Sequence, residues 1–187
     1  LASGIPFNGM FLYVLSAPAF LGDHLKLGPT EFFWFFLITI AGIVSGSWLS
    51  GRLAGRIKPR RQIHRGFAIM FLVSLLNLVL NLVLVPTAAW AMLPIGAFSF
   101  GWALMVPVVT LLVLDLFPDR RGMASSLQAV VSSTANGLVA GIIAPAVMDS
   151  TVKLAATSMG MMLIGLVAWL VLRRHWPEAT MTSGEQT

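Results

Sequence analysis

Three polar side chains, Gln128, Ser132 and Asn136, follow one another at intervals of four residues within the uncharged stretch 122–148. Residues four apart lie on the same face of a helix, so these amide and hydroxyl groups form one polar stripe. Such groups hydrogen-bond either to a neighbouring helix, at about 0.6–2 kcal/mol per contact, or to a molecule in a water-filled cavity. Spacing alone leaves both interpretations open.

A stripe of small side chains runs beside the polar one on the same predicted helix. Small residues at this spacing let the backbones of two helices approach closely, so we expect the stripe to pack against another helix. Its members are Ser125, Ala129, Ser133, Gly137 and Gly141.

Further candidates for contact with a small molecule lie in other apolar stretches. Tyr13, the only tyrosine, shares a helix face with Ser16, and Asn8 stands at the edge of that face. An amphipathic tyrosine ring can stack on a flat drug-like molecule, or its hydroxyl can bond to a neighbouring backbone carbonyl. Trp102 lies near the middle of another apolar stretch and is a candidate for lining a cavity.

The elements that must position these residues are predicted from composition. Of the 187 residues, 57% are hydrophobic and 10% are charged, whereas about a quarter of a soluble domain is charged. Because about 20 apolar residues cross a bilayer as a helix, the uncharged runs predict an all-α membrane protein. It has a six-helix transmembrane domain over 1–176 and a disordered cytoplasmic tail over 177–187. The six spans are expected at about 3–22, 32–51, 66–85, 89–116, 122–146 and 154–172.

The twelve Lys and Arg residues set the expected orientation. Ten lie in the second loop, the fourth loop and the tail, and two lie in the odd-numbered loops. Since basic loops stay in the cytoplasm, both chain ends and the loop 51–65 are expected there. The net charge of +5 is confined to short connections, so it does not predict a nucleic-acid-binding surface.

No catalytic or metal-binding pattern accompanies these residues. The sequence contains no Cys and no H-E-x-x-H, G-x-S-x-G or phosphate-binding loop motif. We therefore expect the protein not to be an enzyme, and we expect neither a metal site nor an organic cofactor.

The basic loop carries a pattern that anchoring alone does not need. The stretch GRLAGRIKPRR, residues 51–61, resembles the loop signature G-x-L-A-D-R-x-G-R-[KR] of the major facilitator superfamily. That signature joins the second and third helices of each six-helix half. Gly55 replaces its usual Asp and Lys58 its second Gly, as is expected of the weaker copy in the second half.

Two other stretches resemble the same superfamily. FPDRRGMASSL, residues 117–127, is similar to its fourth-loop pattern P-x-x-R-G-x-A-S-x-L. FLYVLSAP, residues 11–18, is similar to the seventh helix of bicyclomycin/chloramphenicol-type drug efflux proteins. The chain therefore resembles the carboxy-terminal half of a drug/proton antiporter. This resemblance implies two inverted three-helix repeats, a substrate site near the midplane and a multi-pass location in a bacterial inner membrane.

The activity that the resemblance implies is secondary active transport: multidrug or small-molecule efflux by alternating access, with a proton as the coupling ion. A non-transporting membrane subunit or a channel-like six-helix protein is the alternative. The expected partners are membrane lipid, a drug-like substrate, and an amino-terminal half or a second copy. The expected substrate-cavity residues are Asn8, Tyr13, Ser16, Trp102, Gln128, Ser132 and Asn136. The expected residues of the loop motif and of a conformational latch are Gly51, Arg52, Leu53, Arg56, Arg60 and Asp115.

No acidic residue is predicted at mid-depth in a span, although proton coupling normally uses a buried acid. In the resembling family that acid usually lies in the first half, so we expect this chain to need such a half or a second copy. Asp115 lies near the cytoplasmic end of the predicted helix 89–116, and a carboxylate there should be paired. Its partner is either Arg120 or Arg121, nearby in sequence, or Arg56 (failing that, Arg52), in a latch of the outward-open state that the resemblance implies.

Overall fold

The computed structural model describes residues 3–115 and 118–174, which form helices and no strand. Five of these segments have the length and apolar composition of a membrane span, and the bent pair α1–η1 makes a sixth if it is one span. The predicted all-α membrane fold is confirmed for this part of the chain. The spans are α1 (Gly4–Leu15) with η1 (Pro18–His24), α2 (Phe32–Leu53), α3 (Pro59–Val83), α5 (Leu93–Asp115), the segment Pro118–Val147 and α8 (Thr151–Arg174).

Short elements complete the chain between these spans. The turn η2 (Pro29–Glu31) precedes α2, and α4 (Ala88–Ala91) precedes α5. The segment Pro118–Val147 is built from η3 (Pro118–Arg120), α6 (Arg121–Leu138), η4 (Val139–Ile143) and α7 (Ala144–Val147). The predicted tail 177–187 lies outside the described residues.

Several helix ends differ from the uncharged runs in the sequence. Helix α3 begins at Pro59, seven residues before the predicted start at 66. Proline is well suited to the first helical position because its φ is already helical and its missing N–H has no intrahelical partner there. The first charged residues next to an apolar run indicate where the hydrocarbon core of the membrane ends. The helix itself can continue beyond that point. Arg60, Arg61 and Arg65 consequently lie on the first turns of α3.

The first span is bent. Helix α1 ends at Leu15, η1 begins at Pro18, and their axes meet at 49°. Proline lacks the N–H that would continue the α-helical ladder, and its ring crowds the preceding turn. After Pro18 the chain winds as a π-helix to His24. The predicted span 3–22 is therefore interrupted and ends at His24.

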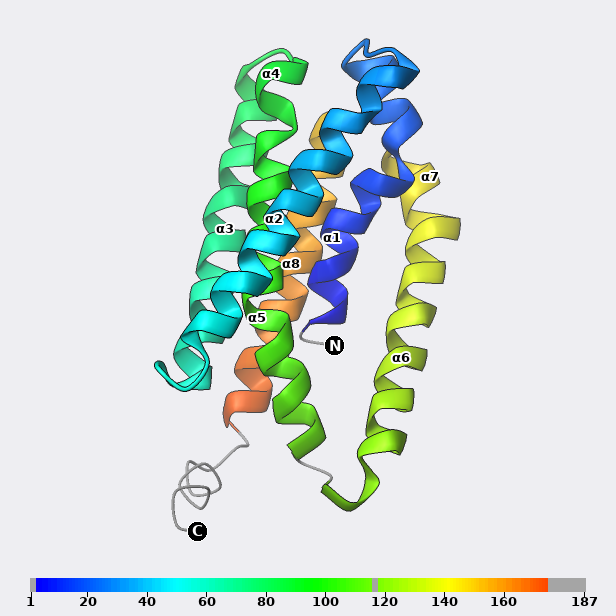
Figure 1. The fold of residues 1–187 in the computed structure, drawn as a ribbon. Coiled ribbons are helices and arrows are strands. Elements are labelled where there is room, and N and C mark those ends of the chain that lie inside the picture. Colours follow the sequence, from blue (N-terminus) through cyan, green and yellow to red (C-terminus); the bar gives the residue numbers. More distant parts are fainter. Residues whose placement is uncertain (1–2, 116–117, 175–187) are drawn as a thin grey trace.

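Helix α5 lies between α2 and α3 and contacts both extensively (Figure 1). Gly42 and Gly46 of α2 bring its backbone close to that of α5. A Cβ at Gly42 would collide with the carbonyl oxygen of Gly96, and one at Gly46 with that of Phe100. Because a glycine has no side chain, these two helices approach as closely as backbones allow.

Helix α6 stands apart from the other helices (Figure 1). The structure describes all of α6, and none of its residues is buried. Apart from the adjacent backbone of their own helical segment, no described atom lies within 4 Å of the Cβ position of Gly137 in α6 or of Gly141 in η4. The expectation that the small-residue stripe packs against another helix is therefore wrong for the helices of this chain. Periodicity identified the stripe but not what lies opposite it.

Candidate functional site

The polar stripe of α6 lies on the side of that helix that is partly covered. Gln128, Ser132 and Asn136 are half-buried, whereas apolar residues elsewhere on α6, such as Leu127 and Val130, are more than 60% exposed. The partial cover comes mainly from α1, with additional contacts from α5. A polar face that is neither tightly packed nor fully exposed is a candidate contact surface for a ligand.

Helices α1 and α6 run in the same direction (Figure 1), and they meet at Gly4. A Cβ on Gly4 would lie 3.0 Å from the Oγ of Ser132. One turn further along each helix stand Asn8 and Asn136, which this register places at the same level. The structure therefore brings together three of the predicted cavity residues between α1 and α6.

Two carboxamide oxygens in this region lack a hydrogen-bond donor. Asn8 is 1% exposed, and its Nδ2 donates to the carbonyl oxygen of Gly4 at 3.0 Å. The Oδ1 of Asn8 and that of Asn136 are buried and have no partner among the described residues. A buried acceptor without a donor costs about 1–3 kcal/mol. These oxygens mark a place where a water molecule or a ligand N–H or O–H group would be stabilised.

Trp102 of α5 closes the region at the other side of α1. Its indole Nε1 donates to the carbonyl oxygen of Ser3 at 2.9 Å, and its ring lies 5.0 Å from that of Phe7. The side chain is half-buried. Trp102 thus joins α5 to the start of α1.

Tyr13 and Ser16 lie on another face of α1. Tyr13 is 3% exposed, and its hydroxyl oxygen accepts a hydrogen bond from Nδ2 of Asn77 on α3 at 2.8 Å. Ser16 is 1% exposed, and its Oγ has no partner among the described residues. A cavity of about 10 Å³ adjoins Tyr13 and Asn77, which leaves room for about one water. In this conformation Tyr13 joins α1 to α3 and does not face the stripe of α6.

The buried amides of α3 extend this contact. Asn81 donates through Nδ2 to the carbonyl oxygen of Asn77 at 2.8 Å and to its Oδ1 at 3.0 Å. Gln62, which the sequence reading did not single out, donates through Nε2 to Ser50 Oγ at 2.6 Å and to the Leu104 carbonyl at 2.9 Å. Gln62 therefore joins α2, α3 and α5 near the basic loop. Its signal in the sequence is a neutral amide directly after Arg60 and Arg61.

The basic loop continues from the end of α2. Gly51, Arg52 and Leu53 form the last turn of α2, and the Arg52 guanidinium lies 4.1 Å from the centre of the Trp48 ring. Gly55 has φ +74°, a left-handed conformation that favours glycine. Glycine therefore suits this turn, at the position where the loop signature usually has Asp. Arg60 lies in the first turn of α3.

Asp115 pairs with Arg121 in this conformation. Nη2 of Arg121 lies 3.2 Å from Oδ1 of Asp115, and both side chains are about 60% exposed. Arg56 and Asp115 line one cleft of about 480 Å³. The nearby partner thus holds the carboxylate here, and the latch between Arg56 and Asp115 stays a prediction for another conformation.

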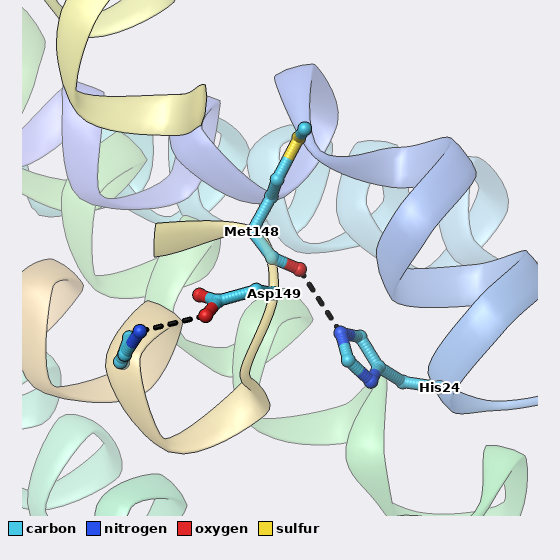
Figure 2. A network of polar contacts seen from close by, with 4 residues as sticks. His24, Met148 and Asp149 are labelled. Carbon is cyan, nitrogen blue, oxygen red and sulfur yellow. Dashed lines mark hydrogen bonds and ion pairs between the residues drawn. The ribbon is translucent and has the colours of Figure 1, made fainter. Parts of the chain in front are cut away.

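A polar network joins the first span to the turn before α8, at the end of the molecule opposite the basic loop (Figures 1 and 2). The ring of His24, with its proton on Nε2, donates to the Met148 carbonyl oxygen at 3.0 Å. Beside it, Lys153 Nζ donates to Asp149 Oδ2 at 2.7 Å. This hydrogen bond from Lys153 lowers the pKa of Asp149. The network holds the bent first span against the α7–α8 turn.

The comparisons with known proteins give one match. The sequence model of the Major Facilitator Superfamily matches residues 1–140. No curated protein and no solved structure matches this chain. The matched range contains the basic loop, Asp115 and the whole polar stripe of α6.

Proposed function

Since the chain belongs to the Major Facilitator Superfamily, we propose that it is the carboxy-terminal six-helix half of a drug/proton antiporter. The family is one of membrane transporters, and the apolar helices are those of an integral membrane protein. The substrate is a drug-like small molecule, which the protein exports across a bacterial inner membrane by alternating access. The chain ends and the basic loop lie in the cytoplasm, as the distribution of Lys and Arg indicates.

The observation that carries this proposal is the half-buried polar stripe of α6 facing α1. A span that packed only against lipid would be apolar on every face, and one buried in a bundle would hydrogen-bond its amides to neighbouring helices. Helix α6 fits neither description, because it carries the polar residues Gln128 and Asn136 on a half-buried face. The carboxamide oxygens of Asn8 and Asn136 have no hydrogen-bond donor among the described residues. A substrate with hydrogen-bond donors would satisfy them. Trp102, Tyr13 and Ser16 complete the proposed cavity residues, with Tyr13 and Ser16 reached only if α1 rotates or shifts.

Proton coupling and the complete cavity need residues from outside this chain. The acidic residues that the structure describes lie at the ends of the spans: Asp23, Glu31, Asp115, Asp119 and Asp149. A second copy would place its described acids at the same span ends, so a coupling acid at mid-depth would have to come from an amino-terminal half. The uncovered face of α6 with Gly137 and Gly141 offers a surface for that partner.

The test is an alanine series in cells that express the complete transporter. Gln128→Ala and Asn136→Ala each remove one hydrogen-bonding group, a loss of about 1 kcal/mol or about fivefold in affinity. We expect the export of those dyes and antibiotics that the unmodified transporter exports to fall by about that factor. Thr134→Ala is the matched control because Thr134 is exposed two residues from the stripe, on the opposite side of α6.

Membrane levels of each variant are measured alongside export, so that a folding defect is separated from a transport defect. Unchanged export by both stripe variants, at normal membrane levels, would contradict the proposed substrate contact. A loss with Thr134→Ala equal to that of the stripe variants would assign the effect to α6 as a whole and not to the stripe.

A further inference from the structure

A second cleft lies at the membrane edge, away from the polar stripe. It has a volume of about 480 Å³ and is enclosed by the α2–α3 connection, the start of α3 and the last turns of α5. These segments come together on one side of the molecule (Figure 1). The lining combines cations, one carboxylate and apolar side chains.

Two cations of the cleft have no anion beside them. Arg56 and Lys58 line it and are exposed, and neither forms an ion pair with any described residue. Both belong to the connection between two spans, where lipid headgroups lie. An exposed Lys or Arg near a membrane surface attracts anionic lipid with about 1 kcal/mol.

The opposite wall of the cleft is apolar. Val108, Leu111 and Leu112 of α5 line it, and Leu111 is 59% exposed. Leu111 and Leu112 precede Asp115 by about one helical turn, which places them about 5 Å deeper along α5 than the carboxylate. The cleft thus offers cations at its rim and aliphatic side chains further in, which matches a molecule with an anionic head and a hydrocarbon tail.

We propose that this cleft binds an anionic phospholipid of the leaflet next to the basic loop. The phosphate lies between Arg56 and Lys58, and an acyl chain runs along Leu111 and Leu112. The unpaired cations select a negative headgroup, and the exposed Leu111 selects a lipid over a free phosphate, which could not cover its side chain. This site is separate from the proposed substrate cavity and does not depend on it.

Whether the lipid can occupy the cleft depends on which arginine Asp115 pairs with. Its carboxylate is on the cleft wall and is held by Arg121 at 3.2 Å. While that pair is formed, Arg56 is available to the lipid phosphate. If Asp115 instead paired with Arg56, it would displace the phosphate from that residue. The lipid therefore favours the conformation in which Asp115 stays with Arg121.

The test measures lipid binding by the purified chain in detergent, by native mass spectrometry. The protein is titrated with dioctanoyl phosphatidylglycerol, with dioctanoyl phosphatidylcholine as the zwitterionic comparison and glycerol 3-phosphate as the soluble one. We expect phosphatidylglycerol to bind most tightly. Arg56→Gln and Lys58→Gln should each weaken it about fivefold and the double variant about 25-fold, since each cation contributes about 1 kcal/mol.

Two further variants separate a site from a general effect of charge. Arg61→Gln removes an equal charge from an exposed residue of the same region that does not line the cleft, and it should bind phosphatidylglycerol as the unmodified chain does. Asp115→Asn should tighten binding by removing the competing carboxylate.

Equal losses of phosphatidylglycerol binding in Arg61→Gln and in the cleft variants, or equal binding of the two phospholipids, would overturn the proposal. Glycerol 3-phosphate binding as tightly as phosphatidylglycerol would overturn the assignment to a lipid. The two proposals can fail separately. If phosphatidylglycerol binds as expected but the stripe variants of α6 export normally, the lipid site is retained and only the proposed function is refuted.

Discussion

At the scale of single residues, Asp115 is the group with the most consequences, because it pairs with Arg121 and lines the same cleft as Arg56. Arg121 holds it at 3.2 Å in the present conformation, and Arg56 lines the same cleft. Both side chains of the existing pair are largely exposed, and an exposed ion pair contributes only about 0–1 kcal/mol. Breaking the pair with Arg121 therefore costs little, which is what the proposed latch with Arg56 requires.

The latch between Asp115 and Arg56 predicts matched effects on transport. Asp115→Asn and Arg56→Gln should each lower the export rate, by about two- to fivefold for a contact of up to about 1 kcal/mol. The double variant should be little worse than either single variant, because the contact can be lost only once. Export rates in cells are the measurement. Losses that add fully would show that the two residues act independently.

Polar residues were the part of the candidate site that the sequence predicted least completely. Spacing identified Gln128, Ser132 and Asn136 as one face of a helix, and they do share its half-buried side. The partner of Tyr13 could not be predicted, because Asn77 lies 64 positions away on α3. Gln62 was missed for the same reason, since its two acceptors come from α2 and α5. The spacing of residues within one helix does not predict which residues of another helix they contact.

At the scale of helices, the α2–α5 contact is where small residues decide the packing. We predict that Gly46→Ala lowers the free energy of unfolding by about 1–3 kcal/mol, because its Cβ would collide with the Phe100 carbonyl oxygen and force the helices apart. Gly160→Ala on α8 is the matched control, since nothing lies within 4 Å of its Cβ position among the described residues. There the better helix propensity of Ala should leave stability unchanged or raise it by up to about 1 kcal/mol.

The measurement is unfolding in detergent, followed by circular dichroism. Opposite signs for the two glycine variants are the expected result. A Gly46→Ala protein as stable as the unmodified one would show that α2 and α5 separate easily.

Six spans were predicted, and the described residues give five, with a sixth if the bent pair α1–η1 is one span. Runs without charge located the apolar segments, because crossing hydrocarbon imposes a length and a composition. The ends were less accurate: α3 starts at Pro59 within the basic cluster, and the first span bends after Leu15. The small-residue stripe was assigned to the wrong packing contact. In this chain the glycines that meet another backbone are on α2, and those of α6 face open space.

At the scale of the whole molecule, the orientation in the membrane is the main prediction. A chain without Cys allows single cysteines to be introduced. Thr30 in η2, before α2, and Arg61 at the start of α3 are both exposed. Because α2 lies between them in the chain, they should lie on opposite sides of the membrane. In intact cells, an impermeant thiol reagent should label Thr30→Cys and leave Arg61→Cys unlabelled until the membrane is opened. The reverse pattern would invert the proposed topology.

The isolation of α6 also bears on how the protein is made. A helix enters the bilayer in proportion to the apolarity of its residues, and central Gln, Asn and Ser residues oppose that entry. The other spans compensate for their amides by bonding to neighbours, as Gln62 and Asn77 do. Helix α6 has no buried residue with which to compensate. We therefore expect α6 to be the span that enters the bilayer least readily on its own and to depend on α1 being already in place. The proposed companion half would cover the face that α1 leaves open.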